Sequence, residues 1–221
     1  FSASEGQSGD GTVAWDGTFF WVSDTTTDTV FQYDSFGIYT GVSIGSITIP
    51  YAMYADGVTL FVANSTTDLV VAYDYLGVPT GFSFSYTAEL PVATGLAFDG
   101  VFFWLVATTT AYKYDSSGVY TGVSKPLDAD TGTVRGIDWD GTYFWANHSG
   151  DLCRYDSNME NGVFIKALLN DGNSRGMGSD GVTFFVLDIT AYDILKYTDA
   201  VGMEGQKVDS NSDLIIYVRV S

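Results

Sequence analysis

The chain has 221 residues and a formal net charge of −18, with nine Lys and Arg against 27 Asp and Glu. A surface of this sign repels phosphate backbones and anionic membranes, so we expect no nucleic-acid partner. Hydrophobic residues make up 46% of the chain, which is enough for the core of one large domain and argues against disorder. No apolar run approaches the length of a membrane span, so we expect no membrane insertion.

Cysteine usage and short motifs indicate where the protein works. The single cysteine, Cys153, excludes an internal disulfide, and its strand-like neighbours indicate a small core residue. The chain begins with Phe1 rather than Met, which predicts a processed protein or a part of a longer one. Two sequons, at Asn64 and Asn147, predict N-glycosylation in loops. Together with a composition rich in Ser, Thr, Gly, Tyr and Asp, they favour an extracellular, cell-surface or virion location.

A unit of 40 to 43 residues is repeated five times. Each unit has an Asp-Gly pair between two apolar, aromatic runs, and the pairs begin at Asp16, Asp56, Asp99, Asp140 and Asp180. A Tyr-Asp marker follows at Tyr33-Asp34, Tyr73-Asp74, Tyr114-Asp115 and Tyr155-Asp156, and it is degenerate in the fifth unit. A repeat of this length, built of short strands, is the signature of propeller blades.

The first unit shows the four strands that we expect in each blade, over residues 12–15, 18–23, 29–33 and 39–44. We expect the Asp-Gly pair to form a type I′ hairpin turn between the first two strands. The Asp of the Tyr-Asp marker should accept hydrogen bonds from backbone N–H groups downstream of it. The sequence thus predicts an all-β fold, a five-bladed β-propeller with four antiparallel strands in each blade. Residues 163–169, helical by composition alone, occupy a fourth-strand position.

We expect one propeller domain over residues 1–212, with repeats starting near 12, 52, 95, 136 and 176. Phe1-Ser2-Ala3-Ser4 resembles the fourth-strand stretch Phe82-Ser83-Phe84-Ser85, so the N-terminus is a candidate for the outer strand of the last blade. A stretch near 205–208 is the alternative. Residues 213–221 predict an extra β-strand outside the repeats, which we expect to pair with another subunit or a neighbouring domain because an uncovered apolar strand aggregates.

The repeats resemble secreted propeller repeats of the NHL/YVTN type. Residues 94–100 followed by Phe103-Trp104, and residues 135–141 followed by Phe144-Trp145, match that pattern best. The third unit departs from it through a shortened loop between its second and third strands. The resemblance implies blade architecture over almost the whole chain. It implies no single activity, since such propellers serve as adhesins, scaffolds, lectins and enzymes.

Residues at the ends of the inner strands provide the candidate ligand site. In propellers, the start of each inner strand shares one face with the loop between the second and third strands, and this face usually binds ligands. The residues that align there are Tyr51, Arg135, Arg175, Asp24 and Asp188. Two arginines on successive blades predict a site for a carboxylate, a sulfate or a sugar acid. The alternative is that they form internal salt bridges with Asp24, Asp188 or Asp138.

Asp138 occupies an inner-strand position and would need a partner there, for which Arg135 and Arg175 are candidates. Asp138 with Asp24 or Asp188 would serve as the acid/base pair of a glycosidase.

Two acidic loops and a histidine complete the candidates. We expect no cofactor, and solvated acidic loops are the default interpretation of these segments. Ca²⁺ is the alternative, because Asp128, Asp130 and Thr131 in one loop, or Asp24 and Asp28 in another, offer oxygen ligands. His148 has no second His or Cys nearby and is interpreted as a loop residue rather than a zinc ligand.

We therefore expect a non-catalytic extracellular binding or structural module, such as a surface, virion or filament subunit, with a glycan or protein partner. The alternative is a secreted carbohydrate-active hydrolase or lyase.

Overall fold

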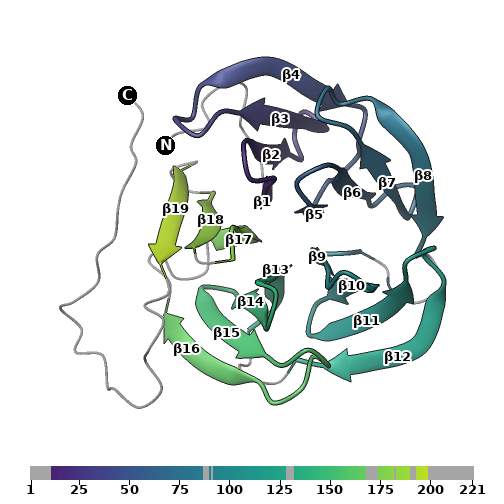
Figure 1. The fold of residues 1–221 in the computed structure, drawn as a ribbon, viewed down its shortest axis with the longest axis vertical. Helices are drawn as coiled ribbons and strands as arrows, with labels where there is room; N and C mark the ends of the chain where they lie inside the picture. Colours follow the sequence, from purple (N-terminus) through teal and green to yellow (C-terminus); the bar gives the residue numbers. More distant parts are fainter. Residues whose placement is uncertain are drawn as a thin grey trace.

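The computed structural model describes residues 11–86, 90, 92–127, 132–167, 174–181, 183–189 and 193–198. Their strands form five separate antiparallel sheets, which stand as blades around a central axis (Figure 1). The molecule is therefore an all-β, five-bladed β-propeller, as the repeats predict. Among the described residues, no helix is long and apolar enough to cross a membrane.

Within each blade the chain runs from the innermost strand outwards (Figure 1). Blade 1 contains β1 (Val13–Trp15), β2 (Phe20–Asp24), β3 (Thr29–Tyr33) and β4 (Tyr39–Gly45). Blade 2 contains β5 (Ala52–Ala55), β6 (Leu60–Asn64), β7 (Leu69–Tyr73) and β8 (Pro79–Ser85). Blade 3 contains β9 (Gly95–Phe98), β10 (Phe102–Ala107), β11 (Thr110–Asp115) and β12 (Tyr120–Pro126). Blade 4 contains β13 (Val134–Trp139), β14 (Phe144–His148), β15 (Asp151–Tyr155) and β16 (Val163–Ala167).

Blade 5 contributes β17 (Ser174–Ser179), β18 (Thr183–Asp188) and β19 (Asp193–Thr198) to the described part of the chain. The segments predicted to supply its outer strand, 1–4 and 205–208, lie outside the described residues, as does the strand predicted over 213–221. The fourth-strand position of blade 4 is a strand, as predicted for the ambiguous stretch that begins at Val163.

The Asp-Gly pairs form hairpins, but the predicted type I′ turn is wrong. Only the glycine has a positive φ, 91° at Gly17, whereas Asp16 does not. The loop has four residues, closed by a hydrogen bond from Asp16 N to Phe19 O. Asp16 Oδ1 accepts hydrogen bonds from the backbone N–H groups of Thr18 and Phe19 at 2.8 and 2.6 Å. The aspartate side chain therefore shapes the turn, in place of a second left-handed residue.

The Tyr-Asp marker behaves as predicted. Asp34 Oδ1 accepts backbone hydrogen bonds from Phe36 and Ile38, and Gly37 between them has a φ of 82°. Blade 4 keeps this turn although Met159 replaces the glycine with a φ of 57°.

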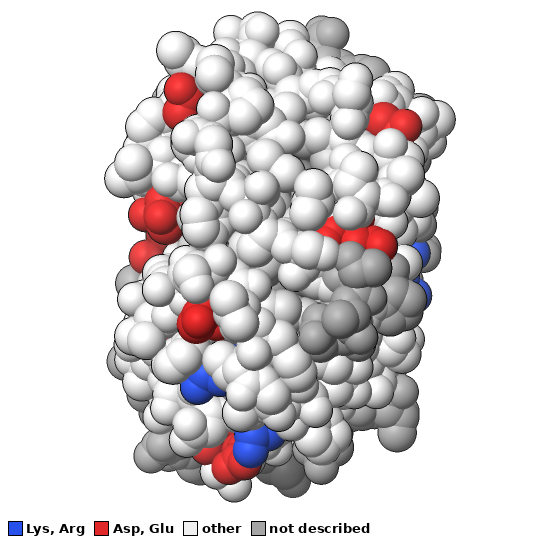
Figure 2. Space-filling model, turned by 90° about the vertical axis from the view of Figure 1, so that its right-hand side faces the viewer, with Lys and Arg blue, Asp and Glu red and all other residues white. Residues whose placement is uncertain are grey.

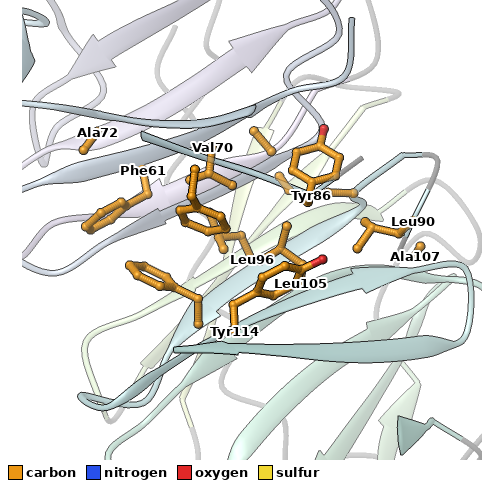
Figure 3. Close-up of a cluster of buried hydrophobic side chains, with 14 residues drawn as sticks. Phe61, Val70, Ala72, Tyr86, Leu90, Leu96, Leu105, Ala107 and Tyr114 are labelled. Carbon is orange, nitrogen blue, oxygen red and sulfur yellow. The ribbon is translucent and has the colours of Figure 1, made fainter. Parts of the chain in front are cut away.

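Five clusters of buried hydrophobic residues fill the five interfaces between neighbouring blades. In β2, Phe20 packs towards blade 5 and Trp21 towards blade 2. The second strands begin with consecutive apolar residues on both faces because both of their faces are buried. Figure 3 shows the interface between blades 2 and 3, where Phe61 and Val70 face Leu105 and Tyr114. The predicted core residue Cys153 lies fully buried in the next interface.

The inner strands approach one another closely around the axis. A Cβ atom on Gly136 of β13 would lie 2.5 Å from the backbone of Gly176 in β17. A Cβ atom on Gly178 would lie 2.8 Å from the backbone nitrogen of Trp15 in β1, so this glycine permits blade 5 to meet blade 1. The inner strands of blades 4 and 5, and those of blades 5 and 1, are therefore in close backbone contact at these glycines.

Candidate binding surface

The antiparallel order gives the propeller two distinct faces. The turns between the first and second strands, and between the third and fourth strands, lie at one edge of every blade. The loops between the second and third strands lie at the opposite edge. We name these the turn face and the loop face. The predicted ligand residues belong to the loop face or to the inner strands, and the Asp-Gly turns belong to the turn face.

The two predicted loop-face carboxylates are buried. Asp24 ends β2, and its Oδ1 accepts hydrogen bonds from the backbone N–H groups of Thr26 and Thr27 at 2.7 and 3.1 Å. Asp188 ends β18 and is 1% exposed. Asp24 therefore shapes its own loop.

The two arginines occupy the same place on adjacent inner strands, as aligned. Arg135 is half-buried, and its Nε donates a hydrogen bond of 3.1 Å to Ser149 Oγ in the loop of the same blade. Arg175 lies one blade further, in β17. Tyr51 is half-buried directly before β5, where its backbone nitrogen donates a hydrogen bond to Ile49 O. A ligand site formed by these three residues stays a prediction.

Asp138 is buried, but backbone groups rather than the two arginines surround its carboxyl. Burial raises the pKa of Asp138 to about 8, although hydrogen bonds from the Trp139 and Ser179 backbones favour the ionised form. Burial, with a smaller contribution from Asp138, also raises the pKa of Tyr54 far above its usual range. Asp138 is thus a carboxylic acid that stays largely protonated at neutral pH inside the ring of inner strands.

The two sequons occupy different environments. Asn64 is half-buried at the end of β6, where its Oδ1 accepts backbone hydrogen bonds from Thr66 and Thr67. Asn147 lies within β14, is fully buried, and accepts hydrogen bonds from Gly150 N and Ser174 Oγ. The expectation of a loop position is therefore wrong for Asn147, because the residue lies within a strand. Its Nδ2 atom, which would carry the glycan, is buried, so a glycan would have no room in the folded protein.

His148 is a strand residue, not the loop residue expected. It is the last residue of β14 and is 1% exposed. Its Nε2 lies 2.8 Å from Tyr155 Oη and its Nδ1 lies 3.2 Å from Gly132 O. The loop that follows it has only residues 149–150, so blade 4 shares the shortened loop that was predicted for blade 3 alone.

Only one of the two proposed calcium-binding loops lies within the described residues. Asp24 Oδ1 and Asp28 Oδ1 accept backbone hydrogen bonds, and the stretch 128–131 lies outside the described residues. Within the described ranges, no three His, Cys, Asp or Glu side chains are grouped to hold a metal ion.

The turn face carries a feature that the sequence interpretation missed. Five apolar side chains at the turns of blades 1 and 2 are largely exposed: Phe36 (72%), Ile38 (61%), Val58 (67%), Leu76 (73%) and Val78 (53%). We name this group the apolar patch. Its turns are tied together, because Gln32 Nε2 of blade 1 donates to Tyr75 O at 2.9 Å and Tyr75 Oη donates to Gly57 O. Val101 (59%) and Val119 (60%) are exposed at the equivalent turns of blade 3. Contiguous exposed apolar groups mark interaction surfaces.

The apolar patch lies among carboxylates. Asp34, Asp56 and Asp74 belong to the same turns, and the first Lys or Arg of the chain is Lys113, in blade 3. The upper part of Figure 2, over blades 1 and 2, accordingly shows acidic side chains without basic ones. At the equivalent turn of blade 3, hydrogen bonds from the Ser117 hydroxyl and the Val119 backbone hold the pKa of Asp115 below its usual range.

Blades 3 to 5, unlike blades 1 and 2, have a basic residue in their third strands. Lys113 Nζ lies 3.8 Å from the centre of the Phe102 ring, and the Arg154 guanidinium lies 4.3 Å from the Tyr143 ring. Lys196 takes the same position in blade 5. Blades 1 and 2 have Gln32 and Ala72 there, so they add no positive charge to the turn face. The alternation of apolar residues and Asp within turn segments was the sequence signal that could have located the patch.

The comparisons with known proteins define the class of fold. No family model and no curated protein sequence matches the chain. A streptogramin B lyase structure is similar with a TM-score of 0.51 and 12% identity, covering 90% of this chain and 68% of that one. The virginiamycin B lyase of Staphylococcus aureus is similar with a TM-score of 0.50 and 13% identity, covering 86% and 66%.

A chain from the mitotic checkpoint complex is also similar, with a TM-score of 0.50, 11% identity, and coverage of 81% and 58%. This chain thus spans 58% and 66% of the first two structures found. At these identities the likeness shows the β-propeller fold alone.

Proposed function

We propose that the protein is a non-catalytic interaction module that binds a basic, partly apolar surface of another protein through the turn face of blades 1 and 2. The single observation behind this proposal is the apolar patch, whose turns carry Asp34, Asp56 and Asp74 and no basic residue. We further propose that the repeats are of the NHL/YVTN type and that the module works outside the cell, as a surface, virion or filament component.

The apolar side chains supply the favourable free energy of such a contact. Full burial of a leucine side chain contributes about 1.5–3 kcal/mol to the free energy of binding. Leu76 is largely exposed in the free protein, so most of this contribution is gained when a partner covers it. The carboxylates contribute selectivity, because they favour a partner with Lys or Arg around an apolar centre. They also disfavour a second copy on the same face, since a chain with a net charge of −18 would meet its own negative surface.

The alternative is a secreted carbohydrate-active hydrolase or lyase. One observation favours it: Asp138 has a pKa of about 8, as a general acid at neutral pH would. The geometry supports it less well than the interaction module. Asp138 is only 6% exposed, and the backbones of Trp139 and Ser179 form hydrogen bonds with its carboxyl, so little of the group is open to a substrate.

A defined probe tests the interaction module. We would titrate the full chain with a fluorescently labelled amphipathic helix of Lys and Leu. The variants Phe36→Ser and Leu76→Ser remove apolar contacts, and Val123→Ser in the middle of β12 is the matched control. We expect each patch variant to weaken binding about tenfold and the control to leave it unchanged. Equal losses in all three variants, or no loss, would overturn the proposal.

A second measurement separates a basic partner from a second copy. Sedimentation velocity of the wild-type chain should give a monomer in low salt, where repulsion between negative faces is strongest. A low-salt dimer that Leu76→Ser dissociates would instead assign the apolar patch to self-association.

A further inference from the structure

A cavity of about 210 Å³ lies between blades 5 and 1, on the side of the turn face. Trp15, Phe20 and Phe185 supply three aromatic rings to its lining, and Ile194 supplies an aliphatic side chain. Ser35 belongs to a turn of blade 1 and is exposed at the rim. A dry apolar cavity of about 150 Å³ can hold a benzene molecule, so this one has room for a single ring with a short substituent.

The same three aromatic positions of the repeat meet again between blades 2 and 3. The residues there are Phe61, Phe98 and Phe103, which correspond to Phe185, Trp15 and Phe20. The ring centres of Phe61 and Phe103 lie 5.1 Å apart, against 4.9 Å for the corresponding pair between blades 5 and 1. Those of Phe98 and Phe103 lie 4.5 Å apart, against 4.3 Å for the corresponding pair. The two trios therefore have the same geometry.

A fourth ring packs against the trio between blades 2 and 3. Phe82 of β8 has its ring centre 6.1 Å from that of Phe61 and 6.2 Å from that of Phe103, and it stacks on the Phe103 ring. Between blades 5 and 1 the corresponding trio borders the cavity. The repeat itself thus shows that an aromatic ring is a group that fits against these three side chains.

Lys196 places a positive charge beside the trio of blades 5 and 1. It is half-buried, lines the cavity, and lies opposite Phe185 in the pairing of β18 with β19. Blade 2 has Ala72 at this position, opposite Phe61. Among the residues that the structure describes, no carboxylate forms an ion pair with Lys196. The cavity therefore adds an ammonium group to an apolar lining.

The basic residue at the same position in blade 3 is covered by a ring. Lys113 Nζ lies 3.8 Å from the centre of the Phe102 ring, at the start of β10. Blade 5 has Thr183 at the start of β18, where no ring is available to cover Lys196. Lys196 Nζ lies 5.9 Å from the centre of the Phe185 ring, inside the lining of the cavity. Its ammonium group is therefore placed to pair with an anionic group in the cavity.

We infer that this cavity binds a small aromatic carboxylate, whose ring packs against Trp15, Phe20 and Phe185 and whose carboxylate pairs with Lys196. Asp180 also lines the cavity and disfavours an anion. It is exposed, however, so solvent screens its charge, and its Oδ1 accepts a hydrogen bond of 2.6 Å from the Thr183 backbone. The cavity and the apolar patch share no residue, so this inference does not depend on the proposed function.

Isothermal titration of the full chain with 3-phenylpropionate tests the charge contact, with the neutral 3-phenylpropanamide as the comparison. We expect the wild type to bind the carboxylate more tightly than the amide. Lys196→Met keeps an aliphatic side chain without the charge, so it should weaken binding of the carboxylate about tenfold and leave binding of the amide unchanged. Lys113→Met, at the same strand position in blade 3, is the matched control and should leave both affinities unchanged.

A blocking variant tests the location. Ser35→Phe adds a ring at the rim of the cavity and should abolish binding of both probes. Ser116→Phe, at the same turn position in blade 3, should leave both affinities unchanged. An unchanged circular dichroism spectrum shows that each variant is folded. Absence of 3-phenylpropionate binding by the wild type, equal losses in Lys196→Met and Lys113→Met, or full binding by Ser35→Phe would each overturn the inference.

Discussion

The carboxylate of Asp16 holds the indole of Trp21, with Trp21 Nε1 donating a hydrogen bond of 2.8 Å to Asp16 Oδ2. The other carboxylate oxygen accepts the two backbone N–H groups of the turn. The same Asp-Trp bond recurs in blades 3 and 4, at 3.1 and 2.6 Å. One residue of the repeat therefore shapes the hairpin and fixes a core tryptophan that packs against the next blade.

Because Asp16 has this double role, we expect the Asp→Ala substitution to destabilise the protein more in blade 1 than in blade 2. Asp16→Ala should destabilise the protein by about 2–4 kcal/mol, because it leaves the buried Trp21 Nε1 unpaired and also removes the turn bonds. Asp56→Ala should cost only about 1 kcal/mol, because blade 2 has Phe61 where blades 1, 3 and 4 have Trp. Urea denaturation of both variants measures the difference, and equal costs would refute the role of the indole bond.

The closure of the ring predicts a second pair of variants. Gly178→Ala should destabilise the protein by about 1–3 kcal/mol, because its Cβ would collide with the Trp15 backbone and push blade 5 away from blade 1. Gly45→Ala is the control, since a Cβ atom there meets no atom within 4 Å. Thermal unfolding would show a lower Tm for the first variant alone. An unchanged Tm for Gly178→Ala would contradict the close approach of β17 and β1.

Asp138 predicts a dependence of stability on pH. Its folded pKa of about 8 lies above the unfolded value of about 3.9, so the folded state binds the proton more tightly. Its contribution to stability is complete below about pH 4 and is lost as the pH rises towards 8. In Asp138→Asn, the side chain keeps the shape of the protonated carboxyl group but cannot ionise. The variant should therefore gain stability over the wild type at pH 8, and this gain should shrink at pH 5.

The comparison of Asp138→Asn with the wild type cancels the titration of the other carboxyl groups. Thermal unfolding at both pH values measures the difference in Tm between the two proteins. The same difference at pH 5 and pH 8 would show that Asp138 does not titrate in this range.

The sequence predicted the blades well because their signals are local. The Asp-Gly and Tyr-Asp markers form hydrogen bonds within a few residues, so the strands of blade 1 lie within two residues of their expected bounds. The environment of individual side chains depended on other blades. Asn147 is buried partly because Ser174 of blade 5 contacts it, and neither residue reveals this in the sequence. The apolar patch was missed because exposed Phe36 and Leu76 resemble core residues when only the composition is considered.

The footprint of the Lys and Leu helix on the wild-type chain is the most direct test of the proposed interaction surface. Amide chemical-shift changes on titration would locate it without any substitution. We predict that the largest changes fall on residues 34–38 and 74–78, at the turn face of blades 1 and 2. Changes centred on Tyr51, Arg135 and Arg175 would place binding on the loop face and contradict the proposal.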